Sequence, residues 1–134
     1  MAEFHRASER RVNAFAVGER YLFKHYFEGD DVFARLRPFY EHSQYRFAVP
    51  APEFPAVASF LADEGYALVE APVPEFVVLV EQYTAHPDDI FADSVAQRTV
   101  DGYNAFLLRD KGAVADATDE GAVRLTETAV ENPF

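Results

Sequence analysis

The sequence predicts a single α+β domain that spans residues 1–134. Two bulk observations support a single globular domain. The chain is close to the usual length of one domain, which is enough to bury a hydrophobic core without disulfides. Hydrophobic residues make up 49% of it and aromatic residues 15%, as is typical of a globular protein. The third observation is a succession of strand-like and helix-like segments between about residues 44 and 110.

The predicted core begins with a strand at 44–49, in which Tyr45, Phe47 and Val49 alternate on one face. Prolines that follow end this strand. Apolar side chains then recur at helical spacing over residues 54–62, and a glycine soon after them stops the helix.

Two further strands are predicted at 66–71 and 76–83. A second helix is predicted to start at Pro87, because proline suits a first helical turn and the two aspartates after it are favourable against the helix dipole. Its buried stripe would consist of Ile90, Phe91 and Val95. Gly102 ends this helix, and a fourth strand follows at 103–109.

This order of elements over about residues 44–110 resembles the βαββαβ pattern of the ferredoxin-like fold, which by itself implies no function. Helices would cover one face of its four-stranded sheet and leave the other face apolar. Such a face is expected to be covered, either by residues 4–40 or by a second subunit in a homodimer.

The flanks are predicted as two extensions of this core. Residues 1–43 form a helical and aromatic N-terminal extension packed on the sheet. Its expected elements are a helix at 5–16, a strand or helix at 21–27, and a helix at 30–36. Residues 111–134 form a C-terminal extension with a helix at 113–117, a short strand at 122–126 and a tail from Glu127 that frays.

The charge balance is the most informative bulk property. The chain carries 23 acidic and 12 basic side chains, a net charge of −11, and only two of the basic residues are lysines. Such acidity is tolerable in concentrated salt, where repulsion between carboxylates is screened within a few ångströms. In this respect the composition resembles that of proteins from extreme halophiles, and we expect the fold to be salt-adapted.

Several classes of protein find no support in the sequence. There is no cysteine, which excludes disulfides, thiolate nucleophiles and cysteine-based metal sites. No apolar run is long enough for a signal peptide or a membrane span, so a cytoplasmic protein without a membrane partner is expected. Glycine-rich phosphate-binding motifs and a nucleophile elbow are also missing, and no cofactor is predicted.

Histidines provide the candidates for catalysis. His86 is the first, because it directly precedes a proline and two carboxylates at an expected helix start. His86, Asp88 and Asp89 together form a candidate cation site, although the same residues also suit an ordinary surface loop and first helical turn. His42 is a second catalytic candidate if the fold brings it near His86.

Basic residues gather in the first third of the chain. Residues 1–46 carry eight basic and seven acidic side chains, whereas residues 47–134 carry four and sixteen. The candidates for nucleic-acid binding are Arg6, Arg10, Arg11 and Lys24. Arginines with neighbouring aromatic rings suit contacts to single strands, but aromatic residues of this kind also build cores, and the arginines can pair with the protein's own carboxylates.

Three functional hypotheses follow. The sequence favours a small, non-enzymatic binding or regulatory domain for an unidentified small ligand or protein partner. The first alternative is a nucleic-acid-associated protein that uses the arginine- and aromatic-rich N-terminal third. The second alternative is a small metal-assisted enzyme centred on His86.

Overall fold

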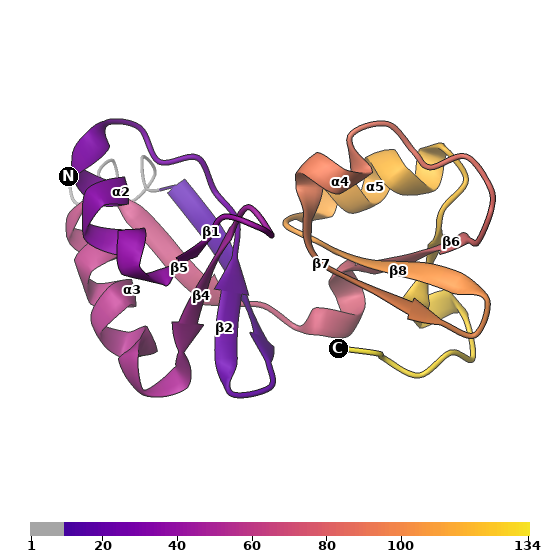
Figure 1. The fold of residues 1–134 in the computed structure, drawn as a ribbon, viewed down its shortest axis with the longest axis horizontal. Coiled ribbons are helices and arrows are strands. Elements are labelled where there is room, and N and C mark those ends of the chain that lie inside the picture. The colour runs from indigo at the N-terminus through magenta and orange to yellow at the C-terminus, as the bar shows by residue number, and fades with distance from the viewer. Residues whose placement is uncertain (1–9) are drawn as a thin grey trace, which may run out of the picture. The chain divides into compact units, whose positions relative to one another are not determined.

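The computed structural model describes residues 10–134, which fold into helices and mixed sheets of the α+β class (Figure 1). Internal contacts divide the chain into two compact units, an N-terminal unit (Met1–Ala71) and a C-terminal unit (Pro72–Phe134), each with its own sheet. That the two units behave together as one domain stays a prediction.

The sheet of the N-terminal unit has five strands in the order β3-β4-β2-β1-β5. Its strands are β1 (Arg10–Val17), β2 (Arg20–Phe23), β3 (Tyr40–Glu41), β4 (Arg46–Pro50) and β5 (Tyr66–Glu70). Strands β1 and β2 form a hairpin whose turn uses Gly18 at φ +65°, a conformation that glycine adopts without strain. Strand β5 runs parallel to β1, so the sheet is mixed.

Two helices, α2 (Asp30–Leu36) and α3 (Phe54–Asp63), pack on one face of this sheet, as Figure 1 shows. Alternate strand residues supply the core beneath them. These include Val12, Ala14, Phe23, Phe47 and Val49, which join Leu36 of α2 and Leu61 of α3 in one buried cluster. The 3-10 helix η1 (Arg37–Phe39) continues directly from α2, because Pro38 cannot extend the hydrogen-bond ladder of the α-helix.

The C-terminal unit is built on an antiparallel sheet in the order β7-β8-β6-β9. Its strands are β6 (Val77–Glu81), β7 (Ser94–Val100), β8 (Tyr103–Leu108) and β9 (Val123–Arg124). The helices are the single turn α4 (Ile90–Asp93) and α5 (Lys111–Asp119). Asp110 is the N-cap of α5, and its side chain accepts a hydrogen bond from the Ala113 amide at 2.8 Å.

Strand β6 is buried on both faces. Val78 and Val80 face the cluster that includes Val114 of α5, whereas Val77 and Leu79 point to the opposite side and are each 1% exposed. The 3-10 helix η4 (Leu125–Glu127) contacts β6. The burial of both faces is therefore complete within a single chain.

The predicted ferredoxin-like order is not confirmed. The strands expected at 44–49 and 66–71 belong to the sheet of the N-terminal unit, as β4 and β5, whereas those expected at 76–83 and 103–109 belong to the other sheet, as β6 and β8. Regular alternation identifies a strand but not its partners. The sheet of the N-terminal unit gains β1, β2 and β3 from the segment before the expected core, and the other sheet gains β9 from the segment after it.

Two predicted helices are corrected. The helix expected from Pro87 is only the short α4, because Ser94–Val100 pairs with β8 as a strand that includes the β-branched residues Val95, Thr99 and Val100. The described part of the helix expected at 5–16 is strand β1, where Val12 and Ala14 alternate into the core. Residues 5–9 of that prediction lie outside the described residues.

Other predicted elements are confirmed. The helices expected at 30–36 and 54–62 correspond to α2 and α3, and the helix at 113–117 lies within α5. The segment 21–27, expected as a strand or a helix, begins within strand β2.

The tail from Glu127, which is expected to fray, contacts β7. Arg98 Nη1 donates to the Pro133 carbonyl at 2.7 Å, and its guanidinium lies over the Phe134 ring.

No helix among residues 10–134 is both long and apolar enough to cross a membrane.

Candidate functional site

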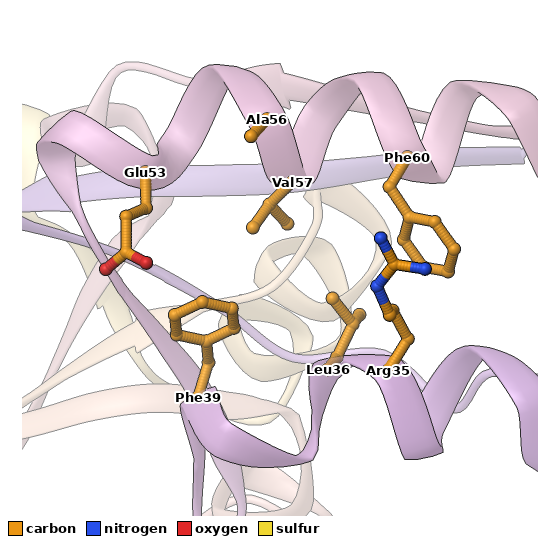
Figure 2. A pocket seen from close by; sticks show the side chains of 7 residues that line it. All are labelled: Arg35, Leu36, Phe39, Glu53, Ala56, Val57 and Phe60. Carbon is orange, nitrogen blue, oxygen red and sulfur yellow. The ribbon is translucent and has the colours of Figure 1, made fainter.

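In the N-terminal unit a groove lies between α2–η1 and α3, with a volume of about 190 Å³. Figure 2 shows its two walls. Seven side chains line it: Arg35, Leu36, Phe39, Glu53, Ala56, Val57 and Phe60. Five of the seven are apolar, so the groove has an apolar surface with a charged group near each end.

Side chains of α2–η1 form one wall of this groove, and side chains of α3 form the other. Leu36 and Val57 turn inward and are 1% and 6% exposed, which makes them the floor. Phe39 lies one turn further along, in η1. Ala56 contributes only a methyl group to the opposite wall, and its small size leaves the space open between the larger side chains.

The charged ends of the groove differ in sign. The Arg35 guanidinium lies over the Phe60 ring, with 5.0 Å between Cζ and the ring centroid. Glu53 lies at the other end, near Phe39 (Figure 2). Among the described residues, neither Arg35 nor Glu53 forms an ion pair or a hydrogen bond through its side chain. Both groups are therefore available to a ligand.

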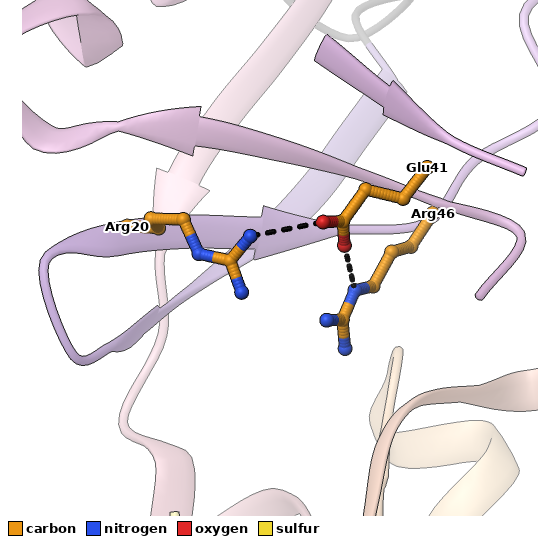
Figure 3. A network of polar contacts seen from close by, with 3 residues as sticks. All are labelled: Arg20, Glu41 and Arg46. Atoms are coloured by element: carbon orange, nitrogen blue, oxygen red, sulfur yellow. Dashed lines mark hydrogen bonds and ion pairs between the residues drawn. The ribbon is translucent and has the colours of Figure 1, made fainter. Parts of the chain in front are cut away.

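A separate charge network ties β3 to the rest of its sheet, as Figure 3 shows. Glu41 accepts hydrogen bonds from Arg46 at 2.8 Å and from Arg20 at 3.0 Å. Burial raises the pKa of Glu41, but the hydrogen bonds from Arg46 and Arg20 more than offset this effect and hold the pKa below its ordinary value. The network satisfies its own charges and is structural.

The metal-binding candidates His86, Asp88 and Asp89 do not line one pocket. His86 packs edge-on against Phe91 and Phe106, with ring centroids 5.1 and 5.7 Å away. Asp88 and Asp89 instead line an acidic hollow beside α5. Its other acidic residues are Asp93, Asp116, Asp119 and Glu120. Within residues 10–134, no group of three or more histidine, aspartate or glutamate side chains is placed to hold a metal ion.

His42 belongs to the N-terminal unit, whereas His86 belongs to the C-terminal unit. The His42 ring packs edge-on against Tyr40 at 4.9 Å. His42 is therefore an exposed residue in contact with an aromatic ring, and this contact gives it no acid or base partner.

Three of the four basic candidates for nucleic-acid binding lie among the described residues. Arg6 lies outside the described residues. Arg10 pairs with Glu28 at 3.2 Å and lies over the Tyr66 ring, and Arg11 donates to Asn13 at 3.0 Å. Since Arg10 and Arg11 are consecutive in β1, their side chains leave opposite faces of the strand. Lys24 follows β2 and is partly buried. Arg10, Arg11 and Lys24 therefore do not form one basic stripe.

The chain matches no protein-family model, no curated protein and no solved structure.

Proposed function

We propose that the chain is a small, non-enzymatic binding domain, and that its ligand is an aromatic monocarboxylate held in the groove between α2–η1 and α3. The observation that carries this proposal is the pairing of an apolar groove with an available guanidinium, that of Arg35, at one end. The proposal specifies the ligand left open by the sequence.

The volume of the groove sets the size of the ligand. A dry apolar cavity of about 150 Å³ accommodates benzene. At about 190 Å³, the groove has room for one six-membered ring and a short substituent. Leu36, Phe39 and Val57 would contact the ring, which gains by leaving water.

The charged residues at the ends of the groove determine which ligand charge it favours. Arginine offers a planar array of donors that matches a carboxylate, and such charge-assisted pairs are stronger than neutral hydrogen bonds. Contact with Phe60 holds the guanidinium in place before a ligand arrives, which lowers the entropy lost on binding. Glu53 at the other end repels a second carboxylate, so the site favours a monoanion over a dianion.

The lining residues support binding rather than catalysis. Glu53 is the one carboxylate among the seven, and the groove contains no serine, threonine, lysine or histidine beside it. General acid-base or nucleophilic chemistry needs a second positioned group.

The experiment is a titration of the ¹⁵N-labelled full chain with benzoate, followed by amide chemical shifts. At roughly 0.5 kcal/mol per non-hydrogen atom, benzoate should bind with a Kd of about 1 mM. We expect shifts that map to α2, η1 and α3. Toluene, which lacks the carboxylate, and terephthalate, which carries a second one, should both bind more weakly. An absence of shifts at those helices with 10 mM benzoate, on the order of ten times this Kd, would overturn the proposal.

A further inference from the structure

A second pocket lies in the C-terminal unit, where the β7–β8 hairpin extends beyond α4. Its volume is about 330 Å³, and it is lined by two aromatic rings, a histidine and several polar side chains. The helix α4 is one turn long and covers only the near end of the hairpin, so residues toward the hairpin turn stay accessible to solvent.

The strand register brings the polar groups together. Gln97 on β7 is opposite Phe106 on β8, and Thr99 is opposite Asn104. These four side chains therefore share one face of the hairpin, since residues two apart on a strand point the same way. Among the described residues, the side chains of Gln97, Thr99 and Asn104 form no hydrogen bonds. Their donors and acceptors are available to a ligand.

The aromatic floor is fixed in position. His86, Phe91 and Phe106 contact one another edge to face, with all three centroid distances between 5.1 and 5.7 Å. Phe106 is buried, whereas Phe91 is 52% exposed. An aromatic ring that is fixed by ring contacts and has about half of its surface exposed is a platform on which a planar ligand can stack.

Charge narrows the class of ligand. Residues 72–134 carry twelve acidic and four basic side chains, which disfavours polyanions. Arg98 is the one cationic side chain that lines this pocket, and its guanidinium is engaged by the Pro133 carbonyl and the Phe134 ring. No carboxylate lines the pocket to attract a cation. A neutral ligand fits these conditions.

From these contacts we propose that the C-terminal unit binds a neutral, planar nitrogen heterocycle of the nucleobase type at this pocket. The heterocycle stacks on Phe91, and its edge exchanges hydrogen bonds with the Asn104 and Gln97 side chains, each of which offers both a donor and an acceptor. The size of the pocket admits a nucleoside as well as a free base. This site is independent of the groove in the N-terminal unit.

The test is a titration of the ¹⁵N-labelled full chain with adenosine, with cytidine and uridine as further bases. We expect amide shifts at β7, β8 and α4. Adenosine monophosphate should bind more weakly than adenosine, because its phosphate meets a unit of negative charge without a free cation in the pocket. Absence of shifts at these elements for all three nucleosides at millimolar concentration overturns the proposal.

Variants separate this site from nonspecific stacking. Phe91→Leu keeps an apolar side chain but removes the platform, and should weaken adenosine binding roughly five-fold or more. Asn104→Ala should weaken it roughly two- to ten-fold by removing hydrogen bonds. Tyr83→Leu is the matched control, because Tyr83 is 99% exposed and does not line the pocket, and it should leave the affinity unchanged.

Two results would contradict the proposal directly. One is equal loss of affinity in Phe91→Leu and Tyr83→Leu, which would indicate stacking on any exposed ring. The other is tighter binding of a single-stranded oligonucleotide than of adenosine, together with an oligonucleotide affinity that falls steeply as the salt concentration rises. Contacts to phosphate would then dominate binding. If Phe91→Leu does not fold, as judged by its amide spectrum, the Asn104→Ala result decides.

Discussion

Arg35 lies over the ring of Phe60, with 5.0 Å between Cζ and the ring centroid, and this contact joins the last turn of α2 to α3 at one end of the groove. A second arginine makes a similar contact with an aromatic ring outside the groove. Arg37 lies over the Phe33 ring at 5.7 Å but does not line the pocket. The two arginines therefore differ in access to a bound ligand and share the same kind of aromatic contact.

This pair provides the first prediction. Arg35→Gln should weaken benzoate binding by roughly ten-fold or more, because it removes a charge-assisted hydrogen-bond donor from the ligand carboxylate. Arg37→Gln should leave the affinity within about two-fold of the original, a difference too small for a lost hydrogen bond. Titrations followed by amide shifts measure both. Equal effects of the two variants would show that Arg35 acts only through general charge.

The second prediction concerns the two faces of β6. Val78→Ala and Leu79→Ala should each lower the free energy of unfolding by roughly 1–4 kcal/mol, since both side chains are at most 1% exposed and lie on opposite faces. Urea denaturation measures the change. Val123→Ala is the control, because Val123 pairs with Leu79 from the adjacent strand but is 41% exposed, and it should cost less than about 1 kcal/mol.

The strands and helices with strong periodicity could be predicted from the sequence, but their assembly could not. Residues 54–62 have apolar side chains at helical spacing and fold as the helix α3. Strands β4 and β6 were both expected, yet they lie in different sheets. Alternation states which side chains share a face of a strand, whereas the pairing of strands depends on long-range contacts that a local pattern does not encode.

The helix predicted from Pro87 is wrong beyond Asp93 for the same reason, namely long-range strand pairing. Residues 94–100 follow a proline and two aspartates that suit a helix start, and the helix does begin, but only for one turn. Pairing with β8, which includes a bulge between Ser94 and Ala96, favours the extended conformation for the residues after it. The helix begins at Ile90 rather than at Pro87, and tertiary contacts thus override the local helix signal.

The groove could not be predicted because its charged residues come from separate elements. Arg35 belongs to α2, and Glu53 precedes α3 after two intervening strands. Nothing in the spacing of these residues indicates that they share a pocket. One usable signal is present in the sequence, because the aromatic residues Phe39 and Phe60 lie near the ends of two predicted helices.

The third prediction tests salt adaptation. The net charge is −11, and six carboxylates line one hollow beside α5. Their repulsion extends over about 10 Å in 0.1 M salt but about 3 Å in 1 M salt. The Tm should therefore rise between dilute buffer and molar KCl. Calorimetry measures this shift, and a flat or falling Tm would contradict the expectation.

A variant links this salt effect to the acidic hollow. Asp116→Asn should raise the Tm in dilute buffer and reduce its dependence on KCl, because one carboxylate leaves the hollow. Asp63→Asn is the control for general charge reduction, since Asp63 lies at the end of α3 and outside that hollow. Similar effects of both variants would attribute the salt response to net charge alone.

The fourth prediction concerns the start of α5. Asp110→Ala should lower the free energy of unfolding by about 1 kcal/mol, because the Asp110 carboxylate accepts a hydrogen bond from the Ala113 amide at 2.8 Å. Asp110→Asn keeps an acceptor at the cap and should retain most of the stability. Equal losses in the two variants would indicate that the charge of Asp110, rather than its capping bond, stabilises the helix.

The last prediction uses the pKa of Glu41. Burial raises this pKa, but the hydrogen bonds from Arg46 and Arg20 outweigh burial, so the folded pKa lies below that of the unfolded chain. A lowered folded pKa stabilises the protein above the unfolded pKa of about 4.3, and the contribution disappears as the pH falls through the folded value. Glu41→Gln should therefore cost about 1 kcal/mol at pH 7. The cost should shrink from about pH 5 downward, because the Glu41 carboxylate then takes up protons in the unfolded chain before it does so in the folded protein. Urea denaturation of both proteins between pH 3 and pH 7, on either side of about 4.3, measures the difference.

Two variants make this test specific to the Glu41 network. Glu19→Gln removes a carboxylate next to Arg20 in sequence that forms no ion pair among the described residues, and should show no comparable pH dependence. Arg46→Gln should cost more than Arg20→Gln, because the Arg46 side chain is 11% exposed and that of Arg20 is 44% exposed. If the cost of Glu41→Gln stays constant down to pH 3, Glu41 stabilises the sheet through its shape and neutral hydrogen bonds, and its charge contributes nothing.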